Sequence, residues 1–457
     1  MKRIAMALAL ALVPATAAAW EPQTTHAGLA EQAALASRLH KRLVTIGFTG
    51  GLFEPLTIPP ADAPALMTVL KLLSPTHGSV PDARGRQTAL AWLTAGAALA
   101  DVPASQGANH FFDPATGAGW TAPDRGLSDK VREALGQSAL PDKGIPAPDW
   151  LTAKANPLNL EQFLNQYAKA VSAATPGERS RYMAAAMVAA GAMLHTLGDL
   201  GAPSRVRGDA AAHLEPLGAG FDDLGSRLER IAALAYGRLG VPGPSRTITR
   251  AHLRDYVTSK DGGGLADLIA RSYFSPNTLP EPTRISSEAK PRLVRPQPAL
   301  PARLNIMAAN RDDGTTLRAS SGTCLARYRV EHDVLTFSLD DDCMLDQLSV
   351  ILPEVTAYET GLLDFLLRGE LTVTAPGGDQ IIVSSKGLGA GSVEILVEDS
   401  RGVRTSLANV AIPGSGENDQ LAQVSAPPAG TRVVAVYRGQ DAAGEPIVAV
   451  GAMPLGR

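Results

Sequence analysis

The stretch that most constrains the fold runs from 178 to 200 and reads ERSRYMAAAMVAAGAMLHTLGDL. After its charged first turn, it carries alanine, methionine and leucine on nearly every side. A helix that is apolar all round has to be enclosed by protein. The chain therefore needs further helices around this one, and His195 and Asp199 near its end are expected to be buried with it.

Helical periodicity predicts the elements that enclose it. Apolar residues recur at helical spacing in the segments 26–45, 86–100, 222–238, 262–274 and 344–368. The last segment contains Pro353, near which we expect the helix to begin or to be interrupted. Gly369 follows it as a C-cap.

The segment 276–301 carries seven prolines, which exclude a regular helix and predict an extended connection. Residues 303–343 then contain short alternating runs such as VLTFSL at 334–339, which predict a small hairpin. The two cysteines of the chain, Cys324 and Cys343, belong to this insert. In an exported protein such a pair is expected to form a disulfide. A reactive thiol would need an activating neighbour that this stretch does not show.

After Gly369 the sequence changes to short β-rich runs, LTVTA, QIIVSS, SVEILVED, RVVAVYRG and PIVAVGA, which turn residues separate. This pattern predicts a small antiparallel β-sandwich. The expected fold class is mainly α. A multi-helix domain occupies 20–369, in which 276–343 form the connection and insert, and the β-sandwich occupies 370–457.

The first 19 residues have the features of a secretory signal peptide: Lys2 and Arg3, an apolar centre, and small residues ending at Ala19. The apolar run is too short to span a bilayer. We therefore expect a secreted or periplasmic protein without a transmembrane segment, and cleavage would make Trp20 its first residue. The formal net charge of −3 provides no basic excess for nucleic acid or anionic lipid.

His195 and Asp199 are four residues apart, so both side chains project from one face of the buried helix. An unpaired carboxylate in an apolar core is unfavourable. Two interpretations satisfy it equally well: a bound metal ion, or a hydrogen-bonded pair of histidine and carboxylate.

Three further candidate ligands lie elsewhere in the sequence. Asp101 follows the 86–100 helix, His110 lies nine residues later in the segment NHFFDP, and His26 is close to Trp20. Taken alone, each is interpreted as a surface residue: a turn carboxylate, a loop histidine and a histidine near a frayed terminus. A free α-amino group, with a pKa of about 8, is nevertheless a usable ligand when the terminus is held in place. The histidines without ligand spacing, expected at the surface, are His40, His77, His252 and His332.

Taken in order, these pieces resemble the zinc-dependent phospholipase C family and the single-strand-specific nucleases that share its fold. The resemblance covers roughly residues 20–270 and includes the helix at 344–368. It rests on Trp20 behind the signal peptide, on the segment HFFDP, and on HTLGDLGAP at 195–203.

The resemblance implies two zinc ions. One is bound by the amino nitrogen and carbonyl oxygen of Trp20 together with His26, the other by Asp101, His110 and His195, and Asp199 bridges them. Mixed nitrogen and oxygen ligands of this kind suit zinc. The carboxylate of Asp101 is also the expected group to orient or deprotonate the attacking water.

The sequence departs from the family at a third zinc site. The first histidine ligand of that site is expected six residues after Asp199, where this chain has Arg205. Arginine offers no lone pair to a metal. His213 stands where the second histidine is expected. The carboxylate candidates are Asp222, Asp223 and Glu215.

Several interpretations of this departure remain open. In the first, which we adopt, the third site is lost and Arg205 contacts the substrate phosphate as a catalytic residue, because its charge stabilises an anionic transition state. In the second, Asp209 rebuilds the site beside His213. In the third, the protein has lost activity and keeps the scaffold. The plainest alternative is that Arg205 and Arg207 form a solvated turn.

The expected function is hydrolysis of a phosphodiester, above all a phospholipid head group, by metal-activated water. The β-sandwich would help the enzyme to engage membranes or partners. A nuclease for single-stranded nucleic acid is the less favoured alternative, because it requires aromatic platforms in a chain with 5% aromatic residues. The candidate platforms are Phe111, Phe112, Trp120 and Trp150. A non-catalytic exported binding protein is the other alternative, and Arg205 is its main support.

Overall fold

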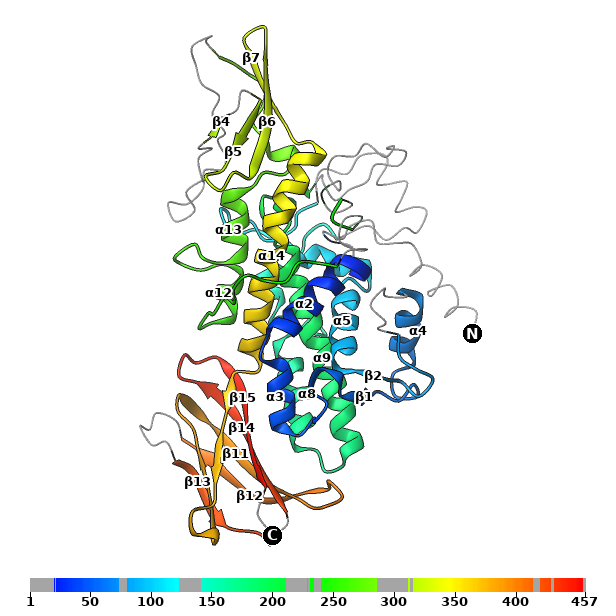
Figure 1. Cartoon of the computed structure of the whole chain (residues 1–457), viewed down its shortest axis with the longest axis vertical. Coiled ribbons are helices and arrows are strands. Elements are labelled where there is room, and N and C mark those ends of the chain that lie inside the picture. Colours follow the sequence, from blue (N-terminus) through cyan, green and yellow to red (C-terminus); the bar gives the residue numbers. More distant parts are fainter. Residues whose placement is uncertain are drawn as a thin grey trace.

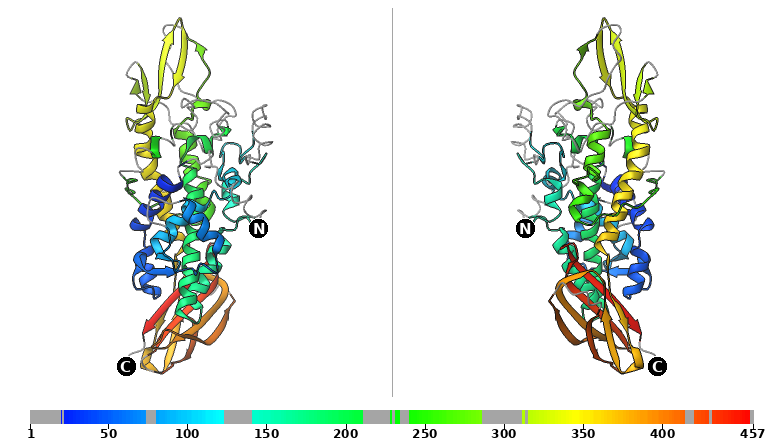
Figure 2. Two further views of the ribbon diagram at one scale, coloured as in Figure 1. Left: turned by 90° about the vertical axis from the view of Figure 1, so that its right-hand side faces the viewer. Right: turned by 90° about the vertical axis from the view of Figure 1, so that its left-hand side faces the viewer.

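The computed structural model describes residues 20, 22–73, 80–122, 141–210, 228, 231–233, 240–285, 311–312, 315–413, 420–428 and 431–454. These residues form an elongated molecule with a small sheet at one end, a helical body in the middle and a β-sandwich at the other end (Figure 1). Two side views show the same order along the long axis (Figure 2). A helical domain followed by a C-terminal β-sandwich confirms the predicted fold class. The predicted signal peptide lies outside the described residues.

The helical body contains α-helices, shorter helical turns and one two-stranded ribbon. Its α-helices in the described part are α2 (Ala27–Ala36), α3 (Leu39–Ile46), α4 (Pro64–Leu73), α5 (Ala89–Leu99), α7 (Ala147–Trp150), α8 (Leu160–Ser172), α9 (Pro176–Asp199), α10 (Pro203–Val206), α12 (Leu253–Val257), α13 (Leu265–Ser272) and α14 (Asp341–Leu366). The shorter elements are the π-helix η1 (Pro22–His26), the 3₁₀ helices η2 (Gly51–Phe53), η3 (Ala104–His110) and η5 (Pro276–Thr278), and the ribbon β1 (Pro55–Thr57) with β2 (Arg86–Thr88). Among the helices of the described residues, none has the length and apolar character that crossing a membrane requires.

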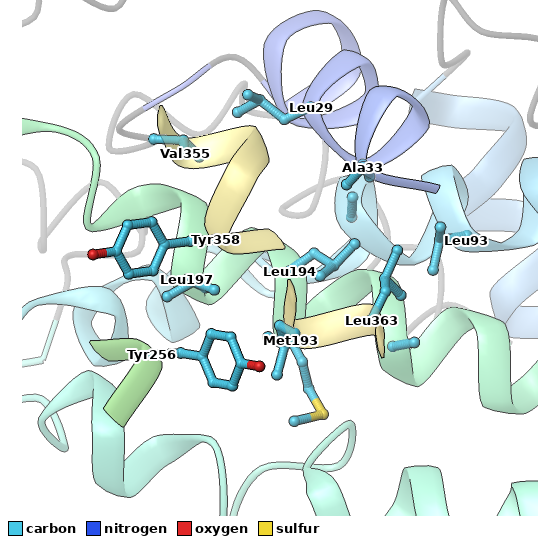
Figure 3. Packing of buried hydrophobic residues seen from close by; sticks show 14 of the residues in the cluster. Leu29, Ala33, Leu93, Met193, Leu194, Leu197, Tyr256, Val355, Tyr358 and Leu363 are labelled. Atoms are coloured by element: carbon cyan, nitrogen blue, oxygen red, sulfur yellow. The ribbon is translucent and has the colours of Figure 1, made fainter. Parts of the chain in front are cut away.

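Helix α9 is the centre of this body, and α2, α5, α8 and α14 pack against it. Every residue from 186 to 200 is buried, which confirms the burial predicted from its apolar sequence. Figure 3 shows side chains from several helices meeting in one cluster, among them Leu29 of α2, Leu93 of α5, Leu194 of α9 and Leu363 of α14. The histidine and the carboxylate of α9 therefore lie inside the protein.

Two glycines allow α5 and α9 to cross at short distance. A Cβ at Gly96 would lie 2.1 Å from a backbone oxygen of α9, and a Cβ at Gly191 would lie 1.9 Å from a backbone oxygen of α5. Any side chain at either position would push the helices apart. The close crossing places the end of α5 and the residues after it against His195.

The N-terminal helices differ from their predicted boundaries. The helix predicted at 26–45 is two helices, α2 and α3. They separate at Ser37, whose hydroxyl donates to the Ala34 carbonyl oxygen, and at Arg38, whose N–H donates to Asp364 of α14. The helix predicted at 86–100 begins at Ala89, because residues 86–88 pair with β1.

The later helices also differ in part. Helix α14 begins at Asp341 and continues through Pro353, so the predicted start or interruption near that proline was wrong. A proline removes one helical hydrogen bond, and the burial of this long helix against α2 and α9 outweighs that loss. The helix predicted at 262–274 is α13. Of the helix predicted at 222–238, the structure describes only residues 228 and 231–233, which are helical.

The insert forms a five-stranded sheet in the order β3-β7-β6-β5-β4. Its strands are β3 (Thr283–Arg284), β4 (Arg311–Asp312), β5 (Thr316–Arg318), β6 (Cys324–Glu331) and β7 (Val334–Ser338). Strands β6 and β7 are the predicted hairpin. The Cys324–Cys343 disulfide is formed as predicted, and it joins the start of β6 to the first turn of α14. Residues 286–301 of the proline-rich connection lie outside the described residues.

The sandwich has one sheet in the order β12-β11-β14-β15-β8 and a second in the order β13-β10-β9. Its strands are β8 (Gly369–Glu370), β9 (Thr372–Thr374), β10 (Gln380–Ser384), β11 (Leu388–Glu398), β12 (Arg404–Ile412), β13 (Gln420–Ser425), β14 (Arg432–Asp441) and β15 (Pro446–Pro454). A short 3₁₀ turn, η7 (Pro376–Gly378), connects β9 to β10. The pairs are antiparallel except that β8 runs parallel to β15. Strands β12 and β13 at the sheet edges were not predicted.

Strands β14 and β15 of the larger sheet are buried on both faces over their central residues, which explains the continuous apolar run of β14. Val433 and Ala435 belong to the core between the two sheets. Val434 and Val436 belong to the core of the helical body, against which β14 and β15 pack through α3 and α8. The domains therefore share an apolar interface at the end of the body opposite the small sheet (Figure 1).

Candidate metal centre

Four residues that the sequence singled out meet beside the end of α9. Asp101 follows α5, His110 ends η3, and His195 and Asp199 lie in the last turns of α9. Each offers a ligand atom, and these four atoms all lie within 4.8 Å of one another. Asp101 is 5% exposed and the other three are fully buried. The surface interpretations of Asp101 and His110 were therefore wrong, because the chain after α5 folds inward against α9.

The two imidazoles each face both carboxylates. His110 Nδ1 lies 2.7 Å from Asp199 Oδ2 and 3.2 Å from Asp101 Oδ1. His195 Nε2 lies 3.3 Å from an oxygen of each carboxylate. His195 and Asp199 therefore belong to a four-residue cluster and do not form an isolated pair.

A backbone contact fixes the direction of His195. Its Nδ1 donates to the carbonyl oxygen of Ala97 at 2.7 Å, across the close crossing of α5 and α9. This bond turns Nε2 toward the carboxylates. A histidine that binds a metal with one nitrogen commonly donates from the other to a backbone carbonyl or a carboxylate.

His26 and Trp20 extend the cluster on its other side. His26 is 1% exposed, and its Nε2 lies 3.0 Å from Asp199 Oδ1. Its ring stacks on that of His195 with centroids 3.6 Å apart. The indole Nε1 of Trp20, a fully buried residue, donates to the Gly198 carbonyl oxygen at 2.8 Å. The interpretation of His26 as an exposed residue of a frayed terminus was wrong, since η1 leads the chain directly into the core.

The two oxygens of Asp199 consequently serve different neighbours. Oδ1 faces His26, while Oδ2 faces His110 and His195. A carboxylate in this position can bind two cations at once, one through each oxygen. The arrangement matches what the sequence resemblance implied for a bridging residue, although the ligand roles themselves stay predictions.

The charges of the cluster are strongly coupled. Burial opposes the ionisation of Asp101, but the two neighbouring histidines outweigh it and lower its pKa to about 2. Burial would also lower the pKa of His195, but the carboxylates outweigh it and raise that pKa to about 10. Burial and the charge of His195 lower the pKa of His26 to about 4. The pKa of Asp199 lies well below its usual value because Arg205 and His195 outweigh the effect of burial.

The ligand atoms fit a metal ion. Neither oxygen of Asp101 makes a hydrogen bond to a described residue, and the same holds for Nε2 of His195, Nε2 of His110 and Nδ1 of His26. Buried polar atoms without hydrogen bonds are unfavourable. Coordination to a cation would satisfy those that face the cluster. Two carboxylates with imidazole nitrogens form a donor set typical of zinc.

Arg205 lies beside the cluster on α10, fully buried. Its Nη1 donates to the Gly107 carbonyl oxygen at 2.7 Å, and its Nη2 lies 3.8 Å from Asp199 Oδ2. The guanidinium carbon is 4.2 Å from the centre of the Phe111 ring. Arg207 is also buried, at 6% exposure, and donates to the Ala270 carbonyl oxygen. The solvated-turn interpretation of these arginines was therefore wrong, because the turn after α9 packs inward against η3 and α13.

The third site falls largely outside the described residues. His213, Asp222, Asp223 and Glu215 all lie there. Asp209 is described and buried, and its carboxylate accepts hydrogen bonds from the N–H and the side-chain amide of Asn277. It does not belong to the four-residue group. His40 and His332 are exposed and His252 pairs with Glu445, whereas His77 lies outside the described residues.

Glu359 is a residue of this region that sequence reasoning missed. It lies on α14, is 1% exposed, and interacts electrostatically with His195 and Asp199. Burial raises the pKa of its carboxyl well above the usual value. The available signal was an acidic residue in the apolar run VTAYETGLL, but no spacing rule connects it to the other ligands.

The chain is similar in structure to two clostridial toxins. An alpha toxin from Clostridium absonum is 12% identical, with 96% of each chain covered and a TM-score of 0.34. The alpha-toxin from an avian strain of Clostridium perfringens is 11% identical, with 94% of this chain and 98% of that chain covered and a TM-score of 0.33. No family model and no curated protein sequence matches the chain. Likeness at this level does not establish shared chemistry.

Proposed function

We propose that this protein is an exported zinc-dependent phosphodiester hydrolase that acts on phospholipid head groups. The observation that carries the proposal is the convergence of Asp101, His110, His195 and Asp199 in one buried cluster. These residues come from three separate parts of the chain, and the family resemblance implies a ligand role for each of them. Bound zinc supplies water activation and neutralises charge on the phosphoryl oxygens.

The residues of the chain have separate tasks in this proposal. Asp101, His110 and His195 would hold one zinc ion, and His26 with the amino nitrogen and carbonyl oxygen of Trp20 would hold the other. Asp199 would serve both, because one of its oxygens faces His26 and the other faces His110. Asp101 would also orient or deprotonate the attacking water.

Arg205 supplies a fixed positive charge at the same centre. It lines a pocket of about 200 Å³ together with Phe111, Asp113 and Trp120. A guanidinium between this pocket and Asp199 can stabilise negative charge that develops on a phosphate. This supports the interpretation in which Arg205 replaces the third zinc as a catalytic group.

Zinc content and hydrolysis test the proposal together. The full exported chain, purified and dialysed, should hold two equivalents of zinc by mass spectrometry. It should hydrolyse phosphatidylcholine in vesicles, and a chelator should abolish this activity until zinc is restored. A protein without bound zinc at neutral pH, or a zinc-loaded protein that cleaves no phosphodiester, would contradict the proposal.

The nuclease alternative is less well supported by the surroundings of the cluster. Stacking of bases requires aromatic rings with an open face. All four candidate platforms are buried, with exposed fractions of 2% to 5% for Phe111, Phe112, Trp120 and Trp150. A parallel assay on single-stranded DNA separates the two activities. The non-catalytic alternative predicts zinc without hydrolysis of either substrate.

A substitution of Arg205 tests our explanation of the third site. In Arg205→His, an imidazole replaces the arginine where the family places a histidine. We expect the zinc content to rise by one equivalent, because His213 and a carboxylate such as Asp222 would complete the site. Unchanged zinc content in a folded variant would show that the site was not lost through this position alone.

The location and partners of the protein belong to the same proposal. The signal-peptide pattern and the formed disulfide support export to the periplasm or the exterior. We further propose that the sandwich domain provides contact with membranes. Fractionation of cells, and binding of the chain to phosphatidylcholine vesicles without hydrolysis, would test these two points.

A further inference from the structure

The burial of the Glu359 carboxyl group is energetically unfavourable, and packing within the helical body does not explain it. It lies in α14 among buried residues, between Tyr358 and Thr360. Figure 3 shows that Val355, Tyr358 and Leu363 of the same helix belong to the apolar cluster. Yet Oε2 of Glu359 is buried and makes no hydrogen bond to a described residue. An apolar side chain would suit this position better if packing alone decided it.

The carboxylate of Glu359 and the ring of His26 both lie close to Gly198 of α9, which has no side chain. A Cβ at Gly198 would lie 2.6 Å from Oε1 of Glu359 and 3.4 Å from Nδ1 of His26. The absence of a side chain at Gly198 is therefore what leaves room for both groups. Glycine inside a helix is unfavourable by about 1 kcal/mol relative to alanine, so the gap has an energetic cost of its own.

The two nitrogens of His26 have different surroundings. Nε2 lies 3.0 Å from Asp199 Oδ1. Nδ1 is buried and makes no hydrogen bond within the described part of the chain, and it faces the same gap as Glu359. A neutral imidazole carries one proton, and the group that accepts this proton decides which nitrogen keeps a lone pair. Two acceptors on opposite sides leave the tautomer of His26 open unless one acceptor is occupied.

We infer that Glu359 is the positioning residue of the second metal: when zinc is bound, its carboxylate would accept a hydrogen bond from Nδ1–H of His26, a bond that is not formed in this structure, and the Nε2 lone pair would be left for the metal held with Asp199. The inference rests on the proposed function, because it concerns a ligand of the zinc pair. A carboxylate in this role orients the ring and increases its basicity as a ligand. Ala97 has the corresponding role for His195, through its backbone carbonyl.

Three variants and a control test this role. Glu359→Leu removes the acceptor and fills the space with an apolar side chain, while Glu359→Gln keeps an acceptor oxygen without the charge. Gly198→Ala leaves the carboxylate in the chain but puts a methyl group between it and His26. Glu354→Gln is the matched control on the same helix, because Glu354 pairs with Arg246 at the surface. Zinc equivalents and zinc affinity, by competition with a chelating dye, are measured for the full chain.

We expect Glu359→Leu to weaken the second zinc by about 10- to 100-fold and to leave the first zinc unchanged. Glu359→Gln should retain most of the affinity, Gly198→Ala should lose part of it, and Glu354→Gln should match the unaltered chain. Metal-free Glu359→Leu should unfold at a denaturant concentration no lower than the unaltered chain, which separates a metal role from a structural one.

Two results would overturn the inference. If Glu359→Leu binds the second zinc as tightly as the unaltered chain, Glu359 does not position His26. If Glu359→Gln loses the second zinc as fully as Glu359→Leu, the carboxylate is itself a ligand. Either result leaves the proposed function standing, provided that the unaltered chain holds two zinc ions and hydrolyses a phosphodiester. Loss of the second zinc in Glu359→Leu, without any hydrolysis by the unaltered chain, would reject the function and keep the inference.

Discussion

Two clusters of buried charge can be compared in this molecule, one at the metal centre and one where the helical body meets the sandwich. In the second, three arginines surround Glu398: Arg404 Nε lies 2.7 Å from its carboxylate, Arg179 Nη2 3.5 Å, and Arg432 Nη1 3.8 Å. Each arginine also donates a hydrogen bond to a backbone carbonyl oxygen of the other domain. Burial and the neighbouring Arg179 lower the pKa of Arg404 to about 10, although Glu398 opposes this shift.

The metal centre is more deeply buried than this second cluster and is bonded differently. Both oxygens of Asp101 and Nε2 of His195 are buried without a hydrogen bond to any described residue. No buried nitrogen of Arg179, Arg404 or Arg432 lacks a partner within the same part of the chain. Burial and charge alone therefore do not mark a functional site. The metal centre is distinguished by several ligand atoms that share one small volume, ion-paired only with one another and without a hydrogen bond to the rest of the described chain.

Among the substitutions that test this difference, Asp101→Asn is expected to have the largest effect. The amide keeps the shape of the side chain but removes the charge and part of the ligand capacity. If zinc supplies several kcal/mol of transition-state stabilisation, hydrolysis should fall roughly 1000-fold, together with loss of one zinc equivalent. The unfolding free energy of the metal-free chain should fall by about 2 kcal/mol, because the histidines outweigh burial, hold the pKa of this carboxyl at about 2, and lose their charged partner in the variant.

Activity on phosphatidylcholine vesicles, zinc analysis and denaturant unfolding measure these three quantities. Retention of both zinc ions and of activity in Asp101→Asn would break the comparison, because unsatisfied oxygens would then have no functional meaning at this centre.

The matched change at the other cluster is Glu398→Gln, which should lower stability without any effect on zinc or activity. The three arginines lose the carboxylate that balances them, and a hydrogen bond to a charged group contributes about 1.5–3 kcal/mol. Because Glu398 is 14% exposed, we expect a loss of about 2 kcal/mol in unfolding free energy. Zinc content and activity per folded molecule should not change. A loss of zinc with unchanged stability would show that the domain interface serves the metal centre directly.

The same distinction explains what the sequence could and could not predict. Local patterns were sufficient for the buried helix α9, the β-rich domain and the disulfide of Cys324 with Cys343, since each depends on neighbouring residues or on a choice of one partner. Asp101 and His110 were placed with His195 only by the resemblance to the zinc-dependent phospholipase C family, because the residues around each of them, taken alone, indicated the surface.

Contacts between distant segments could not be predicted. The break between α2 and α3 depends on Asp364, more than 300 residues away in the chain. Arg205 was expected at a solvated or substrate-facing turn, and only the packing of that turn against η3 reveals its full burial. Glu359 meets His26 through a gap at Gly198, and no sequence period relates these three residues. Tertiary placement therefore decided which polar residues remain unsatisfied.

The smallest expected effect is a difference between the two zinc sites in how their zinc affinity depends on pH. In the metal-free chain the pKa of His195 is about 10, so its proton is bound at pH 8.5 and must leave when zinc binds. The affinity of the first zinc should therefore rise about tenfold per pH unit between 8.5 and 9.5, because the competing proton becomes scarcer. His26, with a pKa of about 4, has no proton to release there, and an α-amino group with a pKa of about 8 is largely neutral.

A His26→Gln variant, which keeps only the first site, allows titration of that zinc alone in two buffers of different ionisation enthalpy. Calorimetry should then show the release of about one proton, and a pH-independent affinity would mean that the carboxylates do not hold His195 in its charged form.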